Sequence, residues 1–409
     1  MRRPGRRIDS RDDGSPGPGA GRPGRGAPRH RPSTAPYNRA LSCTGLRVSS
    51  HGLATILLRI LIVKLSSLGD VVHTLPVVAD LRAAHPGATI DWVVEPSFAP
   101  LLERVDGVAR VIELPLRRWT RDGFWRPRVW RALGDFARGL RGARYDAVLD
   151  LQGLTKSALV AALARGPGFG LANRTEGSSH EWPARWLVAH PIRVEPRSHA
   201  LDRGRALVAR ALGTRDDGAP VYGLRPKVVP AAGADTVVFI HGTSRDDKLW
   251  PEAHWIELGG RLAAAGLRIA LPRVDAAELA RAERLAAAIG EACTVWPSLD
   301  LGALVDRMAG AAGAIGVDSG PSHIAVALGL AHVQIYNHPT AWRTGPQARH
   351  GQAHQVSVEG ERTPSVDAVW SAWQAVRAAA AAPVGARSEA SAGAPAPRHL
   401  DVATAPPRR

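Results

Sequence analysis

Two successive series of alternating strand and helix signals constrain the fold of this chain of 409 residues more than any other feature. In the first series, the apolar run RILIVK (59–64) is bounded by a turn, which is typical of a strand buried on both faces of a parallel sheet. A helix over 71–86, ending at Pro86, and a closing helix over 197–213, ended by Gly213, are also predicted. The remaining strand signals of this series are TIDWVVE (89–95), ARVIEL (109–114) and DAVLDLQG (146–153).

The second series begins after a Pro/Gly-rich link at 218–235 and ends with a helix for which Ser365 is the predicted N-cap. Alternating strands and helices favour parallel sheets, and two such series predict an α/β protein. We expect two doubly wound domains that face each other across a cleft, with ligands beyond the carboxyl ends of the strands. The strand signals of this series are TVVFIHG (236–242), LRIALP (267–272), TVWP (294–297), AIGVDSG (314–320) and HVQIYN (332–337).

The net charge of +16 is unevenly distributed along the chain. Residues 1–56 hold eleven Arg and three Asp, which is half of the excess, in a Pro/Gly/Arg-rich stretch that cannot bury enough apolar surface to fold. The charge raises nucleic-acid binding as an alternative function, but no RRM, KH or helix-turn-helix pattern is present, so we expect no nucleic-acid partner. The predicted organisation is a disordered basic leader (1–56), an N-terminal domain (57–225), a C-terminal domain (235–384) and a disordered tail (385–409).

Neither a membrane span nor a cysteine-based site is predicted. The apolar stretch at 53–63 has eleven residues, is interrupted by Arg59, and precedes no small-residue cleavage site. Cys43 and Cys293 are too few for a disulfide framework or a metal site.

Asp70, in the loop SSLGD (66–70), follows a glycine where the first strand gives way to a helix. An acid at this position either caps the helix or faces the cleft and does chemistry. The residues alone leave both interpretations open.

The loop HGTSRDDKLWP (241–251) contains side chains suited to bind a phosphate. Thr243 and Ser244 offer hydroxyl donors, and Lys248, one of four Lys among 53 basic residues, offers a compact cation. Asp246 and Asp247 are expected to pair with the neighbouring Arg245 and Lys248, because no third ligand stands at metal-binding spacing.

The loop DSGPSH (318–323) is predicted to begin a helix. Ser319, the Gly320 amide and Ser322 are potential donors to an anion at the positive end of that helix, with His323 in its first turn. The alternative is a capped helix start without a ligand. The chain has neither a P-loop nor a dinucleotide fingerprint after a strand, so we expect a different kind of phosphate site in the second half.

Taken together, these segments resemble the glycosyltransferase family 9 heptosyltransferases over residues 58–380, in the family's order. The resemblance implies a GT-B fold, with two Rossmann-like domains, the active site between them, and neither a metal nor a cofactor. The N-terminal domain would bind the acceptor and the C-terminal domain ADP-heptose. The segments are ILIVKLSSLGDVVHTLPVVADL, DWVVEPSFA, LRRW, YDAVLDLQGLTKSAL, HGTSRDDKLWPEAHW and GVDSGPSHIAVALG.

The resemblance also implies an activity and a location. Similar enzymes transfer L-glycero-D-manno-heptose from ADP-heptose to the first Kdo of Kdo2-lipid A, inverting the anomeric centre, in lipopolysaccharide inner-core synthesis. The alternatives are addition of the second heptose, another family 9 acceptor, or an enzyme of the same fold such as a UDP-sugar epimerase. The lipid acceptor predicts a cytoplasmic enzyme that is peripheral on the inner face of the inner membrane.

The site residues follow from the same resemblance. It assigns Asp70 as the general base, and Glu278 as the acid that holds the ribose hydroxyls. Trp119 is a further acceptor candidate, and His73 is expected to pack or orient rather than act as a second base. The predicted donor-binding residues are Thr243, Ser244, Lys248, Glu278, Asp318, Ser319, Gly320 and His323. The predicted contacts to the anionic acceptor are Lys64, Arg117, Arg118 and Arg121.

Overall fold

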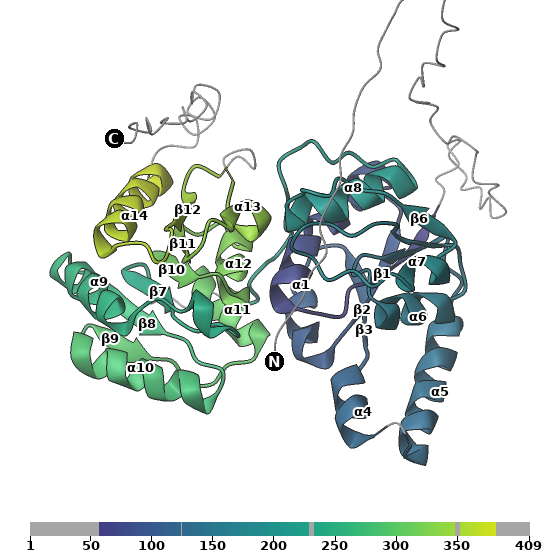
Figure 1. Ribbon diagram of the computed structural model, residues 1–409, viewed down its shortest axis with the longest axis horizontal. Helices are drawn as coiled ribbons and strands as arrows, with labels where there is room; N and C mark the ends of the chain where they lie inside the picture. Colours follow the sequence, from purple (N-terminus) through teal and green to yellow (C-terminus); the bar gives the residue numbers. More distant parts are fainter. Residues whose placement is uncertain (1–56, 124, 229–232, 348–351, 382–409) are drawn as a thin grey trace, which may run out of the picture. The chain divides into compact units, whose positions relative to one another are not determined.

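The computed structural model describes residues 57–123, 125–228, 233–347 and 352–381. The predicted leader (1–56) and tail (385–409) lie outside the described residues. The described part contains two six-stranded parallel sheets with helices packed on their faces (Figure 1). Both sheets confirm the predicted α/β class.

The first sheet has the strand order β3-β2-β1-β4-β5-β6, with every neighbouring pair parallel. Its strands are β1 (Arg59–Val63), β2 (Thr89–Val94), β3 (Val108–Glu113), β4 (Ala147–Asp150), β5 (Gly168–Leu171) and β6 (His190–Ile192). Its helices are α1 (Leu68–Thr74), α2 (Pro76–Ala84), α3 (Ala99–Leu102), α4 (Leu116–Asp122), α5 (Pro127–Arg141), α6 (Thr155–Leu163), α7 (Ala184–Leu187) and α8 (Ala200–Leu212).

The second sheet repeats this topology with the order β12-β11-β10-β7-β8-β9, again parallel throughout. Its strands are β7 (Thr236–Ile240), β8 (Arg268–Leu271), β9 (Cys293–Val295), β10 (Gly313–Val317), β11 (His332–Tyr336) and β12 (Gln355–Glu359). Its helices are α9 (Glu252–Ala264), α10 (Ala276–Ile289), α11 (Leu301–Ala309), α12 (Gly320–Ala327), α13 (Ala341–Thr344) and α14 (Val366–Ala381).

In each sheet the strand order reverses once, between β1 and β4 and between β7 and β10. At such a switch point the loops from adjacent strands lead to opposite faces of the sheet and leave room for a ligand. The loops after β1, β7 and β10 are the three that the sequence singled out.

The apolar strand signals are explained by burial on both faces. The side chains of Ile60, Leu61, Ile62 and Val63 are all fully buried, because helices cover both sides of the central strand. Trp119 is buried as well and packs edge-on against Phe136, as a core residue does, and its contact with an acceptor stays a prediction.

The segment predicted as one helix over 71–86 is two helices in the structure. The first, α1, begins at Leu68, and the second, α2, begins at Pro76, because a proline lacks the amide hydrogen that a continuing helix needs but fits its first position. The closing helix is confirmed as α8, with Gly213 in a left-handed conformation at φ 70°.

Three strands escaped prediction: β5, β6 and β12. The first two are short edge-side segments containing Gly or Pro (GFGL and HPI), whose composition argues against a strand.

The Ser365 N-cap is confirmed, since its hydroxyl accepts a hydrogen bond from the Ala368 amide at 3.2 Å. In the part of the chain that the structure describes, none of the helices combines the length and apolar character needed to cross a membrane.

Candidate functional site

Asp70 stands at the third position of α1, and Ser67 is the N-cap of that helix. Its Oδ2 accepts hydrogen bonds from the Ser67 hydroxyl at 2.8 Å and from the Ser67 amide at 3.3 Å. The bond from the Ser67 amide is the side-chain half of a capping box at the start of α1. The helix-cap interpretation is therefore correct for one oxygen of the carboxylate.

The other oxygen of Asp70 faces two cations. Its Oδ1 lies 3.5 Å from Nζ of Lys64, at the end of β1, and 3.6 Å from a guanidinium nitrogen of Arg203 on α8. Both cations are buried, with side chains 4% and 10% exposed, whereas 38% of the Asp70 side chain is accessible. The carboxylate is therefore the accessible end of a buried charge cluster.

These neighbours set the ionisation of the cluster. Partial desolvation acts to raise the pKa of Asp70, but the charges of Lys64 and Arg203 and the Ser67 hydrogen bonds outweigh it and leave the pKa below its ordinary value. Burial lowers the pKa of Lys64, and the Asp70 carboxylate opposes that shift. Lys64 also donates to the Leu151 carbonyl at 3.0 Å. Asp70 is thus held ionised at neutral pH.

A second cluster centres on Asp318, directly after β10. Lys248 Nζ lies 2.6 Å from its Oδ2, and Oδ1 accepts from the Thr344 hydroxyl at 3.3 Å. The ring of His323 lies 3.5 Å from Oδ1, and the Thr243 hydroxyl donates to the Asp318 carbonyl at 3.3 Å. Burial opposes ionisation, but His323 and Lys248 outweigh it and hold the pKa of Asp318 well below its usual range. The structure thus brings together four predicted donor-side residues.

Four other predicted donor-side residues lie around this cluster. Glu278, in the first turn of α10, lies so close to Gly242 that any side chain there would collide with its carboxylate. Ser319 is the N-cap of α12 and Gly320 its first residue, while Ser244 is exposed in the loop after β7. Ser322 is different: its hydroxyl donates to the Val317 carbonyl at 2.6 Å and is buried, so its prediction as an anion donor is wrong.

His323 connects the two clusters. Its ring centroid is 4.3 Å from that of His73 on α1, and its Cδ2 lies 2.8 Å from where a Cβ on Gly69 would stand. A Cβ on Gly320 would likewise fall 2.5 Å from Cδ2 of Leu68. Two glycines therefore permit the close approach of α1 and α12 that places the Asp70 and Asp318 clusters side by side.

Gly69→Ala is expected to destabilise the protein by about 1–3 kcal/mol, because the new methyl group overlaps the buried His323 ring. Gly134→Ala on α5 is the matched control: its Cβ meets no atom within 4 Å, so helix propensity alone should stabilise by about 0.5–1 kcal/mol. Chemical denaturation of both variants measures the effect. Equal stabilities would mean that the contact at Gly69 is not close.

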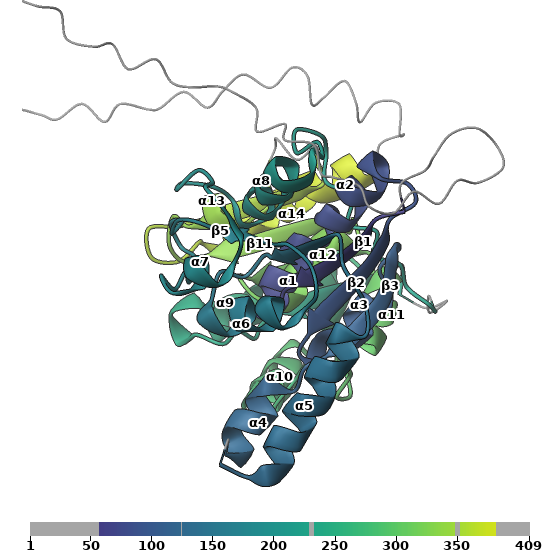
Figure 2. The ribbon, with the colours of Figure 1, turned by 90° about the vertical axis from the view of Figure 1, so that its right-hand side faces the viewer.

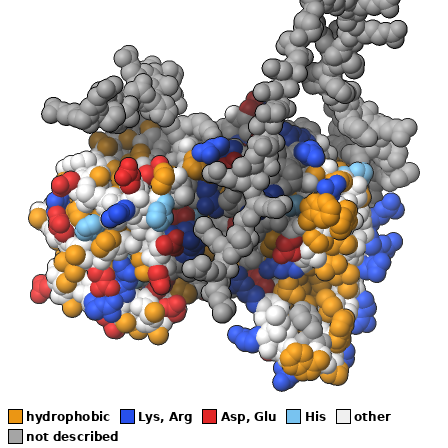
Figure 3. All heavy atoms as spheres, viewed as in Figure 1, with side chains coloured by type: hydrophobic (Ala, Val, Ile, Leu, Met, Phe, Trp, Pro, Cys, Tyr) orange, Lys and Arg blue, Asp and Glu red, His pale blue; other side chains and the backbone are white. Residues whose placement is uncertain are grey.

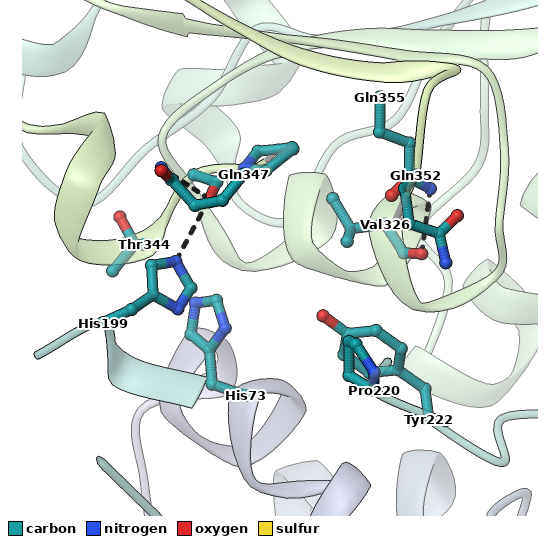
Figure 4. Close-up of a pocket in the computed structure, with 11 residues that line it drawn as sticks. His73, His199, Pro220, Tyr222, Val326, Thr344, Gln347, Gln352 and Gln355 are labelled. Carbon is teal, nitrogen blue, oxygen red and sulfur yellow. Dashed lines mark hydrogen bonds between the residues drawn. The ribbon is translucent and has the colours of Figure 1, made fainter. Parts of the chain in front are cut away.

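A cavity lies beside His73, lined by His199, Tyr222, Val326 and Thr344 among others (Figure 4). The rings of His73 and His199 meet edge-on at 5.4 Å, and neither ring nitrogen of His73 has a hydrogen-bond partner among the described residues. Burial lowers the pKa of His73 well below its ordinary value, as do the adjacent His323 and His199. The His73 ring is thus uncharged and packed against two other imidazoles, and its expected packing or orienting role stays a prediction.

The three predicted acceptor arginines lie on α4 and are exposed. The Arg117 amide donates to the Glu95 carboxylate at 3.1 Å, and Arg118 lies 3.9 Å from Asp122. Lys64 sits beside Asp70, whereas Arg117, Arg118 and Arg121 form a separate group after β3. Among the described residues, no ion pair links this group to the charge cluster of Asp70.

Sequence reasoning missed Arg203 and Thr344. Nothing local distinguishes Arg203 from the other arginines of this Arg-rich chain, because its role arises only when α8 packs on α1.

The predicted pairing of Lys248 with a neighbouring aspartate is also wrong: Lys248 binds Asp318, while Asp247 pairs with Arg245 at 2.6 Å. Within the described ranges, no group of three or more His, Cys, Asp or Glu side chains is placed to hold a metal ion.

Comparison with known proteins gives consistent results. The family model described as "Glycosyltransferase family 9 (heptosyltransferase)" matches residues 133–372. Lipopolysaccharide heptosyltransferase 1 of Escherichia coli (strain K12) is 39% identical over 285 residues, which cover 68% of this chain and 88% of the relative.

Solved structures agree with the sequence relatives. The E. coli heptosyltransferase WaaC with ADP superposes with a TM-score of 0.70 at 35% identity, covering 76% of this chain and 98% of that one. The same enzyme with ADP-2-deoxy-2-fluoro heptose gives 0.67 at 34% identity, with the same coverage. The match extends over both sheets and supports the GT-B arrangement.

Proposed function

Because this chain belongs to glycosyltransferase family 9, the heptosyltransferases, we propose that it transfers L-glycero-D-manno-heptose from ADP-heptose to the first Kdo of Kdo2-lipid A. The observation that carries the proposal is the close approach of Asp70 and the Asp318–Lys248 pair across the Gly69–His323 contact. The names of the relatives and the ADP and ADP-heptose analogue complexes support this pair of substrates.

In this reaction Asp70 is the general base. Its carboxylate takes the proton of the acceptor hydroxyl while that oxygen forms a bond to the anomeric carbon of the heptose. The bond from that carbon to ADP breaks, and its electron pair leaves with the β-phosphate oxygen. Attack on the face opposite to ADP inverts the anomeric centre, through a state with oxocarbenium character.

The leaving group develops negative charge on the donor side. Lys248 keeps ammonium hydrogens beyond the one directed at Asp318, and its side chain is 33% exposed, so it is available to a phosphate. The Gly320 amide at the start of α12 adds a second donor with the helix dipole behind it. Glu278 and Thr243 would complete the nucleotide contacts.

The two cations around Asp70 explain why it is ionised when it must accept a proton. A base with a pKa below the ordinary value stays deprotonated as the pH falls, so transfer should be lost only at acidic pH. Arg203→Met removes one of the cations and is expected to raise the pKa of Asp70, moving the acid limb of the kcat/KM profile to higher pH.

A pH–rate profile of Arg203→Met measures this shift. Arg210→Met changes an exposed residue on the same helix and should leave the profile unchanged. Arg203→Lys keeps the positive charge, so its acid limb should lie close to that of the unmodified chain. An acid limb that stays in place in a folded Arg203→Met protein would remove Arg203 from this role.

The acceptor is strongly anionic, and the exposed Arg117, Arg118 and Arg121 fit its carboxylates and phosphates. Lys64, which lies beside Asp70, would also contact the acceptor. Since Kdo2-lipid A is a membrane lipid, the proposed location is the cytoplasm, with peripheral attachment to the inner face of the inner membrane.

The experiment that tests the function is incubation with ADP-heptose and Kdo2-lipid A, in the presence of EDTA, followed by mass spectrometry. A mass gain of one heptose is expected. A folded protein that modifies only the already heptosylated acceptor would instead be a heptosyltransferase II, and one that accepts neither would act on another core acceptor.

A further inference from the structure

Exposed large apolar side chains are concentrated on neighbouring helices of the first half. Nine such side chains occur in the described ranges, and five of them belong to α5, α6, α7 or the turns that lead into α5 and α7. In the structure α5 packs against α6 and α6 against α7 (Figures 1 and 2). The five are Trp125 (82% exposed), Trp130 (60%), Leu159 (52%), Trp182 (61%) and Trp186 (64%).

The exposed tryptophans of α5 and its preceding turn have no role in the core. The buried side of α5 is supplied by Val129 and Leu140, with Leu133 and Phe136 packed beside them. Trp130 lies outside this cluster. Trp125 stands over the turn that joins α4 to α5, where Gly123 has φ +92° and a Cβ would fall 2.5 Å from the indole. The turn thus presents an indole at the end of the α4–α5 hairpin, which extends beyond the sheet (Figure 2).

Positive charge surrounds these side chains. Residues 116–141 contain eight Arg and two Asp. Both Asp are paired, Asp122 with Arg128 at 3.2 Å and Asp135 with Arg138. The net charge of this segment is therefore positive. On α7, Arg185 lies 5.5 Å over the Trp182 ring. Figure 3 shows hydrophobic side chains over α7, along α5 and at the end of the hairpin, with basic side chains beside them.

We propose that this tryptophan–arginine face (Trp125, Trp130, Leu159, Trp182 and Trp186 with the arginines of α4, α5 and α7) docks the protein on an anionic lipid bilayer. Four of the five apolar side chains are indoles, and indole prefers the headgroup level of a bilayer. Arginines beside them are attracted to anionic headgroups without insertion of a helix. The identity of the lipid surface rests on the proposed function, because a lipid acceptor would lie in it.

Vesicle binding of the full chain tests the proposal. Phosphatidylcholine vesicles with and without phosphatidylglycerol are sedimented with the protein, and tryptophan emission is recorded. We expect binding only to the anionic vesicles, a blue shift of the emission, and weakening at high salt. The double variant Trp125→Ser/Trp130→Ser and the double variant Arg126→Glu/Arg131→Glu should each lower the partition coefficient about tenfold or more.

The controls separate this face from the basic leader. Residues 1–56 hold eleven Arg but no Trp, so an emission shift reports on the chain after residue 56. Val274→Ser and Arg268→Glu/Arg362→Glu replace exposed side chains elsewhere and should bind as the unmodified chain does. Binding that survives both double variants, equal binding to neutral vesicles, or self-association through this face in sedimentation velocity would overturn the proposal.

Activity on a de-O-acylated acceptor distinguishes this proposal from the proposed function. The double variants should transfer heptose to that soluble acceptor at the unmodified rate, because none of their residues belongs to the active site. If the unmodified chain transfers heptose but does not bind anionic vesicles, the docking face is refuted and the proposed function stands. Vesicle binding without transfer to any acceptor would refute the proposed function and leave the docking face standing.

Discussion

Asp70→Asn is expected to lower kcat/KM for heptose transfer by roughly 10²–10⁴-fold, the range typical of a lost general base. The amide can still accept the Ser67 hydrogen bonds that hold the start of α1, so the helix cap is preserved. It cannot take a proton from the acceptor hydroxyl. Initial rates with ADP-heptose and Kdo2-lipid A, together with calorimetric ADP binding, measure the effect.

ADP affinity should be retained in Asp70→Asn, because the donor residues belong to the other half of the structure. Loss of the carboxylate leaves the buried Lys64 and Arg203 without their shared partner, so thermal unfolding must be measured in parallel. Asp367→Asn, which alters an exposed acid in the first turn of α14, is the matched control. Full activity in a folded Asp70→Asn protein would reduce Asp70 to a helix cap.

Lys248→Met is expected to have the second largest effect, a loss of roughly 10²–10³-fold in kcat/KM. The ammonium would stabilise the charge that develops on the departing ADP, and a thioether cannot. Asp318 would keep His323 and the Thr344 hydroxyl as partners, so the loop should stay in place. Rates at varied ADP-heptose concentration and calorimetric ADP binding check the prediction.

Lys248→Arg should not restore the rate, because the planar guanidinium cannot occupy the place of a compact ammonium 2.6 Å from Asp318. Lys227→Met is the control, since the Lys227 side chain is more than half exposed and its ammonium lies 3.8 Å from Glu103. Unchanged ADP affinity and kcat/KM in Lys248→Met would contradict its assignment to the donor site.

Much of the fold follows from sequence pattern. The buried strands β1, β4, β7 and β10 are nearly continuous apolar runs, which are typical of a sheet covered on both faces, whereas β2 also buries Asp91. The strands that escaped prediction lie toward the edges, where short segments are held by pairing with a neighbour rather than by their own composition. Register and edge strands are therefore decided by tertiary contacts.

The candidate site divides in the same way. Sequence pattern predicts which loops follow the central strands, and with them the positions of Asp70, Lys248 and Asp318, because strand–loop–helix order is a local property. By contrast, Arg203, distant in the chain, faces Asp70, and Lys248 pairs with Asp318, because of how the helices and loops pack in three dimensions. Ion pairs between distant segments depend on how helices pack, and a single sequence carries no local signal for that packing.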